Sequence, residues 1–271
     1  MCELLGLSSN APATVNFSLP KLAEHGAASG TYNDGWGIGY YEGHDVRLIK
    51  DAGPVGDSDW VRFIANHQLR SELIVAHARR ATRGTRSYQN AQPFIRELAG
   101  WVHLFAHNGD LPGIFQAAGF RPNRFNPIGD TDSERAFCVL LDRMAPIWSQ
   151  ANGVPPLSAR FAIVSSFARE LRALGPANFL YSDGDVLFAH GHRRKHAETG
   201  KTEAPGLVFL QRECEHGESS IAVSGLSVRG DRQDVTLFAS VPLTEERWTP
   251  LVEGELVAVV RGELVRRGTG D

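Results

Sequence analysis

The sequence predicts an α+β fold in which strands and helices form separate layers. Short apolar runs rich in β-branched and aromatic residues recur along the chain, as is typical of strands. Five of these runs come first, two long helical patterns follow, and further runs close the sequence without a long polar linker. We therefore expect the 271 residues to form one domain, residues 1–271. The expected strands are 3–7, 36–41, 46–49, 73–78, 101–106, 179–182, 186–189, 206–210, 221–223 and 235–239, followed by a hairpin in 254–265 with Arg261 and Gly262 at its turn.

Helical periodicity is clearest from Thr131 to Trp148, where apolar residues recur at spacings of three and four. Thr131 and Glu134 add the pattern of a capping box at the start of this helix. Shorter helices are expected at 58–68, at 157–174 after two prolines, and as a single turn near Thr244.

Composition and charge favour a small-molecule partner. The hydrophobic share of 42% and charged share of 22% are typical of a globular protein with a sizeable core. A net charge of −3 gives no basic surface for nucleic acid or anionic membrane, so we expect neither partner. No leader sequence or apolar span is recognisable. Cys2, Cys138 and Cys214 are too far apart for a disulfide framework or zinc site and suit a reducing cytoplasm.

Cys2 directly follows Met1, which is the most informative feature of the chain. Removal of Met1 would leave one residue with both a thiol and a free α-amine. An α-amine of pKa roughly 7.7 to 8.0 is matched to accept the proton of a thiol of pKa about 8.5. N-terminal-nucleophile chemistry needs only that pair. Because a lone cysteine at position 2 is more often there by chance, the downstream sequence must carry the assignment.

The first downstream segment is HARRAT, residues 77–82, at the end of an apolar run. A strand end is a usual place for a functional site. Arg79 can bind a carboxylate through two parallel hydrogen bonds, which fixes a small amino-acid substrate in one orientation. The alternatives are a surface salt bridge for Arg79 and a core position with satisfied hydrogen bonds for His77.

The second segment is HNGD, residues 107–110, directly after another strand. Asn-Gly is first of all a turn signal. Its functional interpretation is an oxyanion hole, in which the Asn108 amide and the Gly109 backbone N–H converge on the oxygen of a tetrahedral intermediate.

The third segment is GDTDSE, residues 129–134, at the start of the long helix. Carboxylates are favoured there by the exposed N–H groups of the first turn, which is a sufficient structural explanation. The functional alternative is that Asp132 pairs with the ammonium of an amino-acid substrate and so complements Arg79.

The chain resembles the class-II glutamine amidotransferases, which are N-terminal-nucleophile hydrolases. The resemblance is carried by four motifs in this order and spacing: MC, HARRAT, HNGD and TDSE. Within this family, the chain looks most like the stand-alone branch, whose members are little more than the glutaminase domain. The segments that carry this likeness are MCELLGLS, NDGWGIGYYEG and AHARRATRG with NAQPF. The resemblance is close over about residues 2–140 and looser beyond. It implies a four-layer αββα sandwich, with two stacked, mainly antiparallel sheets between helix layers.

The resemblance also implies residue roles. Cys2 would be the nucleophile with its α-amine as base, and Asn108 with Gly109 would form the oxyanion hole. Arg79 and Asp132 would hold the α-carboxylate and α-ammonium of the substrate. Further substrate-binding candidates are Arg80, Thr82 and His107.

The implied reaction is hydrolysis of the γ-amide of L-glutamine through a γ-glutamyl thioester, which releases ammonia and glutamate. No cofactor or metal is expected. The sequence leaves open the ammonia acceptor and any partner protein that supplies it. Two alternatives stay open: a hydrolase of a γ-glutamyl conjugate other than glutamine, since no synthase domain is recognisable, and a catalytically silent subunit that senses an amino acid.

Two positions depart from the family pattern. Arg80 stands where many relatives carry Trp, and Gln92 stands where the stand-alone branch often has His. Residues 83–92 would form the loop that folds over bound glutamine, and its arginines Arg83 and Arg86 could instead select a different acidic substrate.

Three other signals receive structural interpretations. The histidines at 190, 192 and 196 lack a recognisable set of metal co-ligands. The basic run 193–195 is expected to be a solvated loop. The glycines of 35–39 are expected to let a strand approach the N-terminal nucleophile closely.

Overall fold

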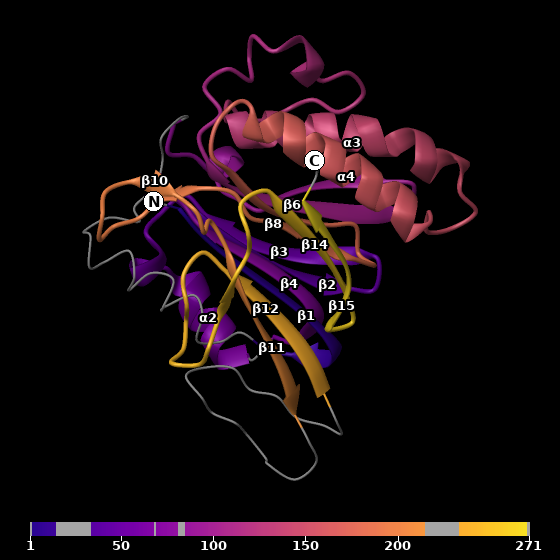
Figure 1. Ribbon diagram of the computed structural model, residues 1–271. Helices are drawn as coiled ribbons and strands as arrows, with labels where there is room; N and C mark the ends of the chain where they lie inside the picture. The colour runs from indigo at the N-terminus through magenta and orange to yellow at the C-terminus, as the bar shows by residue number, and fades with distance from the viewer. Residues whose placement is uncertain (1, 15–33, 68, 81–84, 215–232, 270–271) are drawn as a thin grey trace.

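Two antiparallel sheets stacked face to face form the centre of the molecule (Figure 1). The structure is a computed structural model that describes residues 2–14, 34–67, 69–80, 85–214 and 233–269. A buried layer lies between the sheets, with Leu4, Val75, Leu104, Leu180 and Phe238 among its members.

The larger sheet has seven strands with β1 in the middle. Leu5 of β1 lies opposite Ala76 of β4 on one side and Ala239 of β12 on the other. In spatial order the strands are β13 (Thr249–Pro250), β11 (Val208–Cys214), β12 (Gln233–Ala239), β1 (Glu3–Ala13), β4 (Ser71–Ala78), β2 (Trp36–Glu42) and β3 (Asp45–Asp51).

The second sheet has six strands. Its β14–β15 hairpin turns at Arg261 and Gly262, whose φ angles of 48° and 83° lie in the left-handed region, as the sequence predicts. In spatial order the strands are β15 (Glu263–Thr269), β14 (Glu255–Val260), β8 (Leu187–His190), β7 (Ala177–Ser182), β6 (Trp101–Gly109) and β5 (Phe94–Leu98). A separate small hairpin pairs β9 (Arg194–Lys195) with β10 (Thr202–Glu203).

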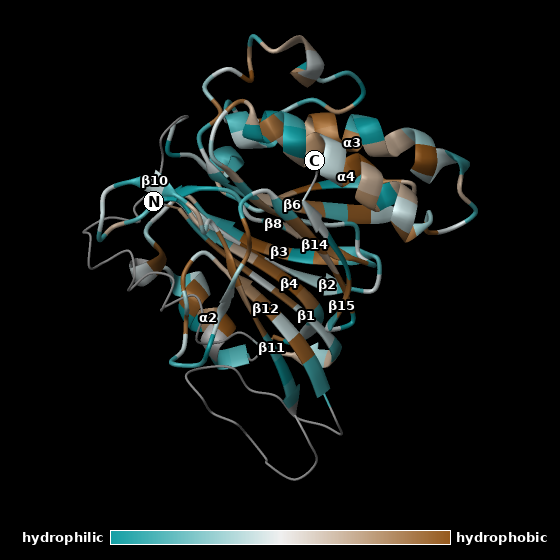
Figure 2. Ribbon diagram, viewed as in Figure 1, coloured by the Kyte–Doolittle hydropathy of each residue, from teal (hydrophilic) through white to brown (hydrophobic). Residues whose placement is uncertain are grey.

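Helices cover the outer faces of both sheets. α3 (Asp132–Gln150) and α4 (Leu157–Arg172) pack on the six-stranded sheet, and α2 (Asp59–His67) packs on the seven-stranded sheet through Ile64. Figure 2 shows apolar residues along the strands of the sheets. Apolar residues of α3 and α4, among them Phe137, Leu140 and Phe167, are buried in one cluster with the six-stranded sheet, which is why these elements pack in layers. The four-layer α+β prediction is confirmed. Short 3₁₀ turns occupy Val55–Asp57, Tyr88–Asn90 and Ala118–Phe120.

The start of α3 uses half of the predicted capping box. Thr131 Oγ1 accepts a hydrogen bond from the Glu134 backbone N–H at 3.2 Å, as expected of an N-cap. The Glu134 carboxylate does not reach back to Thr131. It accepts from the backbone N–H groups of Ile128 and Gly129, at 3.1 and 2.7 Å, and pairs with Arg96. The carboxylate therefore fixes the segment before the helix.

Two predictions about local structure are wrong. The expected helical turn near Thr244 is a series of bends, because Thr244 Oγ1 bonds the Glu246 carboxylate at 2.7 Å and accepts from the Trp248 indole at 3.1 Å. The strand glycines do not make room for the N-terminal residue. A Cβ at Gly37 would lie 2.5 Å from the Gln92 carbonyl oxygen, and one at Gly39 would lie 2.4 Å from the Leu104 side chain.

The other expected strands are present, except that 221–223 lies outside the described residues. The sequence does not predict β5 or the β9–β10 hairpin. β5 carries charged residues, and each strand of the β9–β10 hairpin is only two residues long. In the described ranges, no helix is both long and apolar enough to cross a membrane.

Candidate active site

Cys2 lies at the start of β1, beside the end of β4. The register that places Glu3 opposite Ala78 puts Cys2 next to Arg79 and Arg80. The Cys2 Sγ atom is 3.2 Å from both the backbone nitrogen and the carbonyl oxygen of Arg80. The HARRAT segment therefore reaches the thiol, although the two lie 78 residues apart in sequence.

Asn108 and Gly109 approach Cys2 from the other sheet. Asn108 Nδ2 donates to the Cys2 carbonyl oxygen and to Ser240 Oγ, at 3.3 Å to the latter. Ser240 directly follows β12, and its Oγ accepts from the Leu4 backbone N–H at 3.0 Å. The end of β6 is therefore tied to β1 and β12 across the layer between the sheets.

Gly109 is the last residue of β6, so the Asn-Gly pair belongs to a strand and is not a turn. A Cβ at Gly109 would lie 1.8 Å from the carbonyl oxygen of Pro176. Only glycine fits such a close backbone approach. Its requirement here is steric and independent of catalysis.

Arg79 is buried, with 3% of its surface exposed, which rules out a surface salt bridge. Its Nη1 donates to the carbonyl oxygens of Asp34 and Thr85, at 3.0 and 3.2 Å. His77, two residues earlier and near the end of β4, is a core residue. Burial lowers the pKa of His77 to about 3, and the positive charge of Arg79 acts in the same direction. The imidazole is therefore neutral.

Asp132 is buried at the start of α3. Its Oδ2 accepts from the Leu111 backbone N–H at 2.8 Å, and its Oδ1 accepts from the Ser133 N–H at 2.9 Å. His107 Nδ1 lies 2.9 Å from Ser133 Oγ. Burial lowers the pKa of His107, and the Asp132 carboxylate partly opposes this shift.

The two residues before Gly109 face opposite layers because side chains alternate along a strand. Asn108 faces Cys2, whereas His107 is buried on the α3 side against Ser133. His107 therefore contacts the helix that carries Asp132. Arg79, Arg80, Asn108 and Gly109 gather around Cys2, and Thr82 lies outside the described residues.

Burial raises the pKa of the half-buried Cys2 thiol above its ordinary value. The backbone N–H of Arg80 and the Arg79 guanidinium act in the opposite direction, and Glu3 raises the pKa further. The thiol is therefore protonated at neutral pH. In a chain that retains Met1, the nitrogen of Cys2 is a peptide amide and cannot accept its proton.

Gln92 supports the candidate oxyanion segment and was recognised in the sequence only as a departure from the family. Its Oε1 accepts from the His107 backbone N–H at 2.6 Å, and its Nε2 donates to the His107 carbonyl oxygen at 3.2 Å. β5 begins only at Phe94. The Gln92 amide thus continues the backbone pairing of β6 to the residue before Asn108.

Asn90 fixes the described part of the loop that precedes β5. Its Nδ2 donates to Asp130 Oδ1 at 2.6 Å and to the Thr85 carbonyl oxygen at 2.9 Å, and its Oδ1 accepts from the Asp130 N–H at 3.1 Å. Residues 85–90 are therefore attached to the segment that leads into Asp132. Asn90 and Ser240 carry no local sequence signal, because only long-range contacts reveal their positions.

A pocket of about 550 Å³ opens at Cys2. Asn108, Gly109, Asp110 and Pro176 form its wall on the side of the six-stranded sheet. The remaining wall is basic and comes from the end of β4 and the β9–β10 hairpin, with Arg80, Arg193, Arg194, Lys195 and Thr202. In Figure 1, β10 lies at the end of the sheets where the chain starts.

The basic run 193–195 is therefore not simply a solvated loop, as the sequence suggests. Arg194 is buried, pairs with Glu3 at 3.2 Å and donates to the Ser240 carbonyl oxygen. Arg193 pairs with Glu253 at 2.7 Å. Lys195 is exposed and lines the pocket.

The neighbouring histidines each contact a different group. His190 Nδ1 lies 3.0 Å from the Glu255 carbonyl oxygen, and His192 Nδ1 accepts from the Ala177 N–H at 3.3 Å. His196 Nε2 lies 3.1 Å from the Glu203 carbonyl oxygen. Within the part of the chain that the structure describes, no three His, Cys, Asp or Glu side chains form a group suited to a metal ion.

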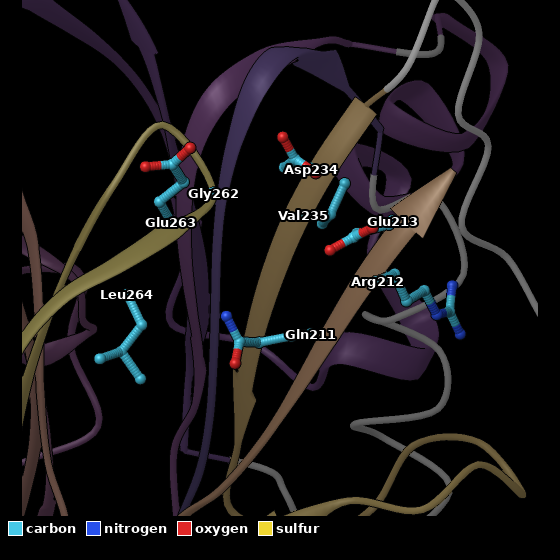
Figure 3. Close-up of a pocket in the computed structure, with 8 residues that line it drawn as sticks. All are labelled: Gln211, Arg212, Glu213, Asp234, Val235, Gly262, Glu263 and Leu264. Carbon is cyan, nitrogen blue, oxygen red and sulfur yellow. The ribbon is translucent and has the colours of Figure 1, made fainter. Parts of the chain in front are cut away.

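A second pocket, of about 560 Å³, lies where β11 and β12 face the β14–β15 turn. Figure 3 shows Gln211, Asp234 and Glu263 around it. Asp234 and Ser240 are six residues apart on β12 and its end, or roughly 20 Å along an extended chain. No candidate residue lines this second pocket, so it is separate from the Cys2 site.

Comparison with known proteins identifies the family of this chain. The family model of the class-II glutamine amidotransferases matches residues 1–270. YafJ of Escherichia coli (strain K12), provisionally named a glutamine amidotransferase, is 36% identical over 266 residues, which cover 98% of this chain and 100% of YafJ.

Two solved structures share the fold. A predicted glutamine amidotransferase from Pseudomonas aeruginosa PA01 superposes with a TM-score of 0.67 at 30% identity, covering 98% of this chain and 100% of that one. The glutamine phosphoribosylpyrophosphate amidotransferase of B. subtilis gives 0.59 at 14% identity, covering 100% of this chain and 49% of that one. The second similarity concerns the fold alone.

Proposed function

This chain belongs to the class-II glutamine amidotransferase family, and we propose that it hydrolyses the γ-amide of L-glutamine with Cys2 as nucleophile. The observation that carries the proposal is the convergence of Cys2, Asn108 and Gly109 from two different sheets on one pocket. A nucleophile and two candidate oxyanion donors are the minimum that acyl transfer requires.

In the proposed first step, Sγ attacks the carbonyl carbon (Cδ) of the glutamine γ-carboxamide, and a sulfur–carbon bond forms. The thiol proton passes to the α-amine of Cys2, which is free once Met1 is removed. As the carbon–nitrogen bond breaks, this proton goes to the departing nitrogen, which leaves as ammonia. Because burial raises the thiol pKa, a base next to the sulfur is needed to start the reaction at neutral pH.

The tetrahedral intermediate carries a negative oxygen. Asn108 Nδ2, which now donates to the Cys2 carbonyl oxygen, and the backbone N–H of Gly109 would donate to that oxygen. The close contact of Gly109 with Pro176 and the pairing of Gln92 with His107 hold this segment rigid. Fixed donors stabilise developing charge without reorganisation during the reaction.

In the second step, water adds to the γ-glutamyl thioester. The α-amine takes one proton from the water, the carbon–sulfur bond breaks, and the proton returns to sulfur. The second product is glutamate. Arg79 and Asp132 are proposed to orient the substrate through its α-carboxylate and α-ammonium, because both are buried charged groups near the chain segments that surround Cys2.

We further propose that residues 1–271 form one domain and that the protein is cytoplasmic. The three buried clusters are shared between the two sheets and the helices, so no described segment has a core of its own. Cys2 and Cys138 are free thiols, as is usual in a reducing compartment.

The test is a glutaminase assay on protein whose Met1 removal is verified by mass spectrometry. We expect release of glutamate and ammonia, and loss of this activity in Cys2→Ala. Cys138→Ala is the matched control, because Cys138 is buried in α3 away from the pocket. A fully processed protein that neither cleaves glutamine nor is labelled at Cys2 by a glutamine-like diazoketone would instead be a silent sensing subunit.

A further inference from the structure

The pocket beside Cys2 is much larger than the release of ammonia requires. Ammonia is about the size of water, whose share of liquid volume is roughly 30 Å³. The pocket measures about 550 Å³, which lies in the range of small-molecule binding sites. A pocket of this size next to the nucleophile can hold a leaving group with many atoms, such as an amine much larger than ammonia.

The lining of the pocket contains charges of both signs. Asp110 belongs to the wall formed by the end of β6, where its charge also acts on His107. Arg80 and Lys195 line the same pocket from the segment after β4 and from β9. Arg193 and Arg194 are already paired, with Glu253 and Glu3. Arg80 and Lys195 have no acidic side-chain partner among the described residues, so they are the cations available to a ligand.

The position of these cations indicates which part of the substrate they would meet. Arg79 and Asp132, the proposed ligands of the glutamyl group, do not line this pocket. The backbone of Arg80 lies 3.2 Å from Sγ, so its side chain starts beside the bond to be cleaved. Lys195 lines the same pocket from β9 of the β9–β10 hairpin. A group that leaves from the amide carbonyl carbon and projects away from Arg79 and Asp132 would enter the pocket that both cations line.

We propose that this pocket binds the amine portion of a γ-glutamyl amide, and that this amine carries a carboxylate, as an amino acid or short peptide does. Arg80, whose backbone adjoins Sγ, would bind a carboxylate next to the scissile nitrogen, and Lys195 would bind a carboxylate elsewhere in the same pocket. The chemistry is that of glutamine hydrolysis: the carbon–nitrogen bond breaks, the nitrogen takes the proton and the free amino acid departs. This inference rests on the proposed function and specifies its substrate class.

The test compares γ-glutamylglycine with γ-glutamylglycinamide in the Met1-processed enzyme. These substrates differ only in a terminal carboxylate or carboxamide. We expect kcat/KM to be about tenfold or more higher for γ-glutamylglycine, because a charge-assisted hydrogen bond to the carboxylate is lost in the neutral analogue. Arg80→Gln together with Lys195→Gln should reduce this ratio toward one.

Lys201→Gln is the matched control. Lys201 is exposed on the same hairpin as Lys195 but does not line the pocket, so Lys201→Gln removes a lysine charge near the site and should keep the ratio. Equal rates for the two substrates in the wild-type enzyme, or a ratio that survives in the double variant, would overturn the inference. Cleavage of glutamine without cleavage of either γ-glutamyl peptide would overturn the inference alone. Absence of cleavage of all three compounds would overturn the proposed function as well.

Discussion

Asn108 Nδ2 donates a hydrogen bond to the carbonyl oxygen of Cys2. This bond joins the end of β6 to the residue that directly precedes β1. The contact spans 106 residues of sequence and the space between the two sheets. It places the candidate nucleophile and a candidate oxyanion donor in one rigid unit, from which the following predictions are derived.

Replacement of Asn108 by alanine should reduce kcat about 10²- to 10³-fold, because one oxyanion donor is lost. KM should change little, since the donor acts mainly on the intermediate. Steady-state kinetics of glutamine hydrolysis measure both constants. Thermal unfolding of the same variant separates this effect from the loss of the contact with Cys2. A change confined to KM would contradict an oxyanion role.

Gly109→Ala should destabilise the protein by about 1 to 3 kcal/mol or more, because the new Cβ overlaps the Pro176 carbonyl oxygen. Gly113→Ala is the matched control. A Cβ at Gly113 meets only the Leu174 side chain at 3.6 Å, an ordinary contact. Denaturant unfolding of both variants tests the difference. If the two variants are equally stable, the close approach at Gly109 is not rigid.

Gln92→Glu should lower both stability and kcat at neutral pH. A carboxylate can still accept from the His107 N–H, but it cannot donate to the His107 carbonyl oxygen. The protonated acid can donate, so folding should raise the pKa of the new carboxyl. Its favourable contribution is then present below the unfolded-state pKa and is lost as the pH rises through the folded-state pKa.

The measurement is thermal unfolding of Gln92→Glu and wild type over a pH series. The stability difference between the two proteins should shrink as the pH falls. A constant difference would mean that the side chain at position 92 does not pair with the His107 backbone as the structure describes.

Arg79→Gln should move the alkylation of Cys2 to higher pH. Burial already raises the thiol pKa, and the Arg79 cation is one of the groups that oppose this rise. Without the cation, the thiolate needs a higher pH to form. Arg79→Lys keeps the positive charge and should shift the profile less. The pH dependence of iodoacetamide labelling at Cys2, located by mass spectrometry, gives the midpoint for each protein.

An unchanged midpoint in Arg79→Gln would show that the guanidinium does not act on the thiol. Circular dichroism of the three proteins checks that each is folded, which matters because Arg79 is buried.

The periodicity of the chain was enough to predict most strands and the long helices, because burial of one face imposes a repeat on apolar residues. The helix from Thr131 and the turn at Arg261 and Gly262 show this directly. The turn expected near Thr244 failed, because side-chain bonds among Thr244, Glu246 and Trp248 replace the helical pattern.

Only part of the candidate site could be predicted from the sequence. Cys2, Arg79, Asn108, Gly109 and Asp132 stand in short motifs that resemble a family, so the sequence alone named them. Gln92 drew notice only as a departure from that family, and its pairing with His107 could not be foreseen. The prediction of a solvated loop at 193–195 is wrong for Arg194, because this residue pairs with Glu3, which is 191 residues away in the sequence.

The sequence by itself determined the layered α+β fold and the residue types available for chemistry, since both depend on local patterns. The tertiary structure alone decided that Asn108 faces Cys2 while His107 faces α3, and that Lys195 shares a pocket with the thiol. These relations depend on the register between strands and on which face each side chain takes. Register is fixed by packing among residues far apart in the sequence, so no local pattern specifies it.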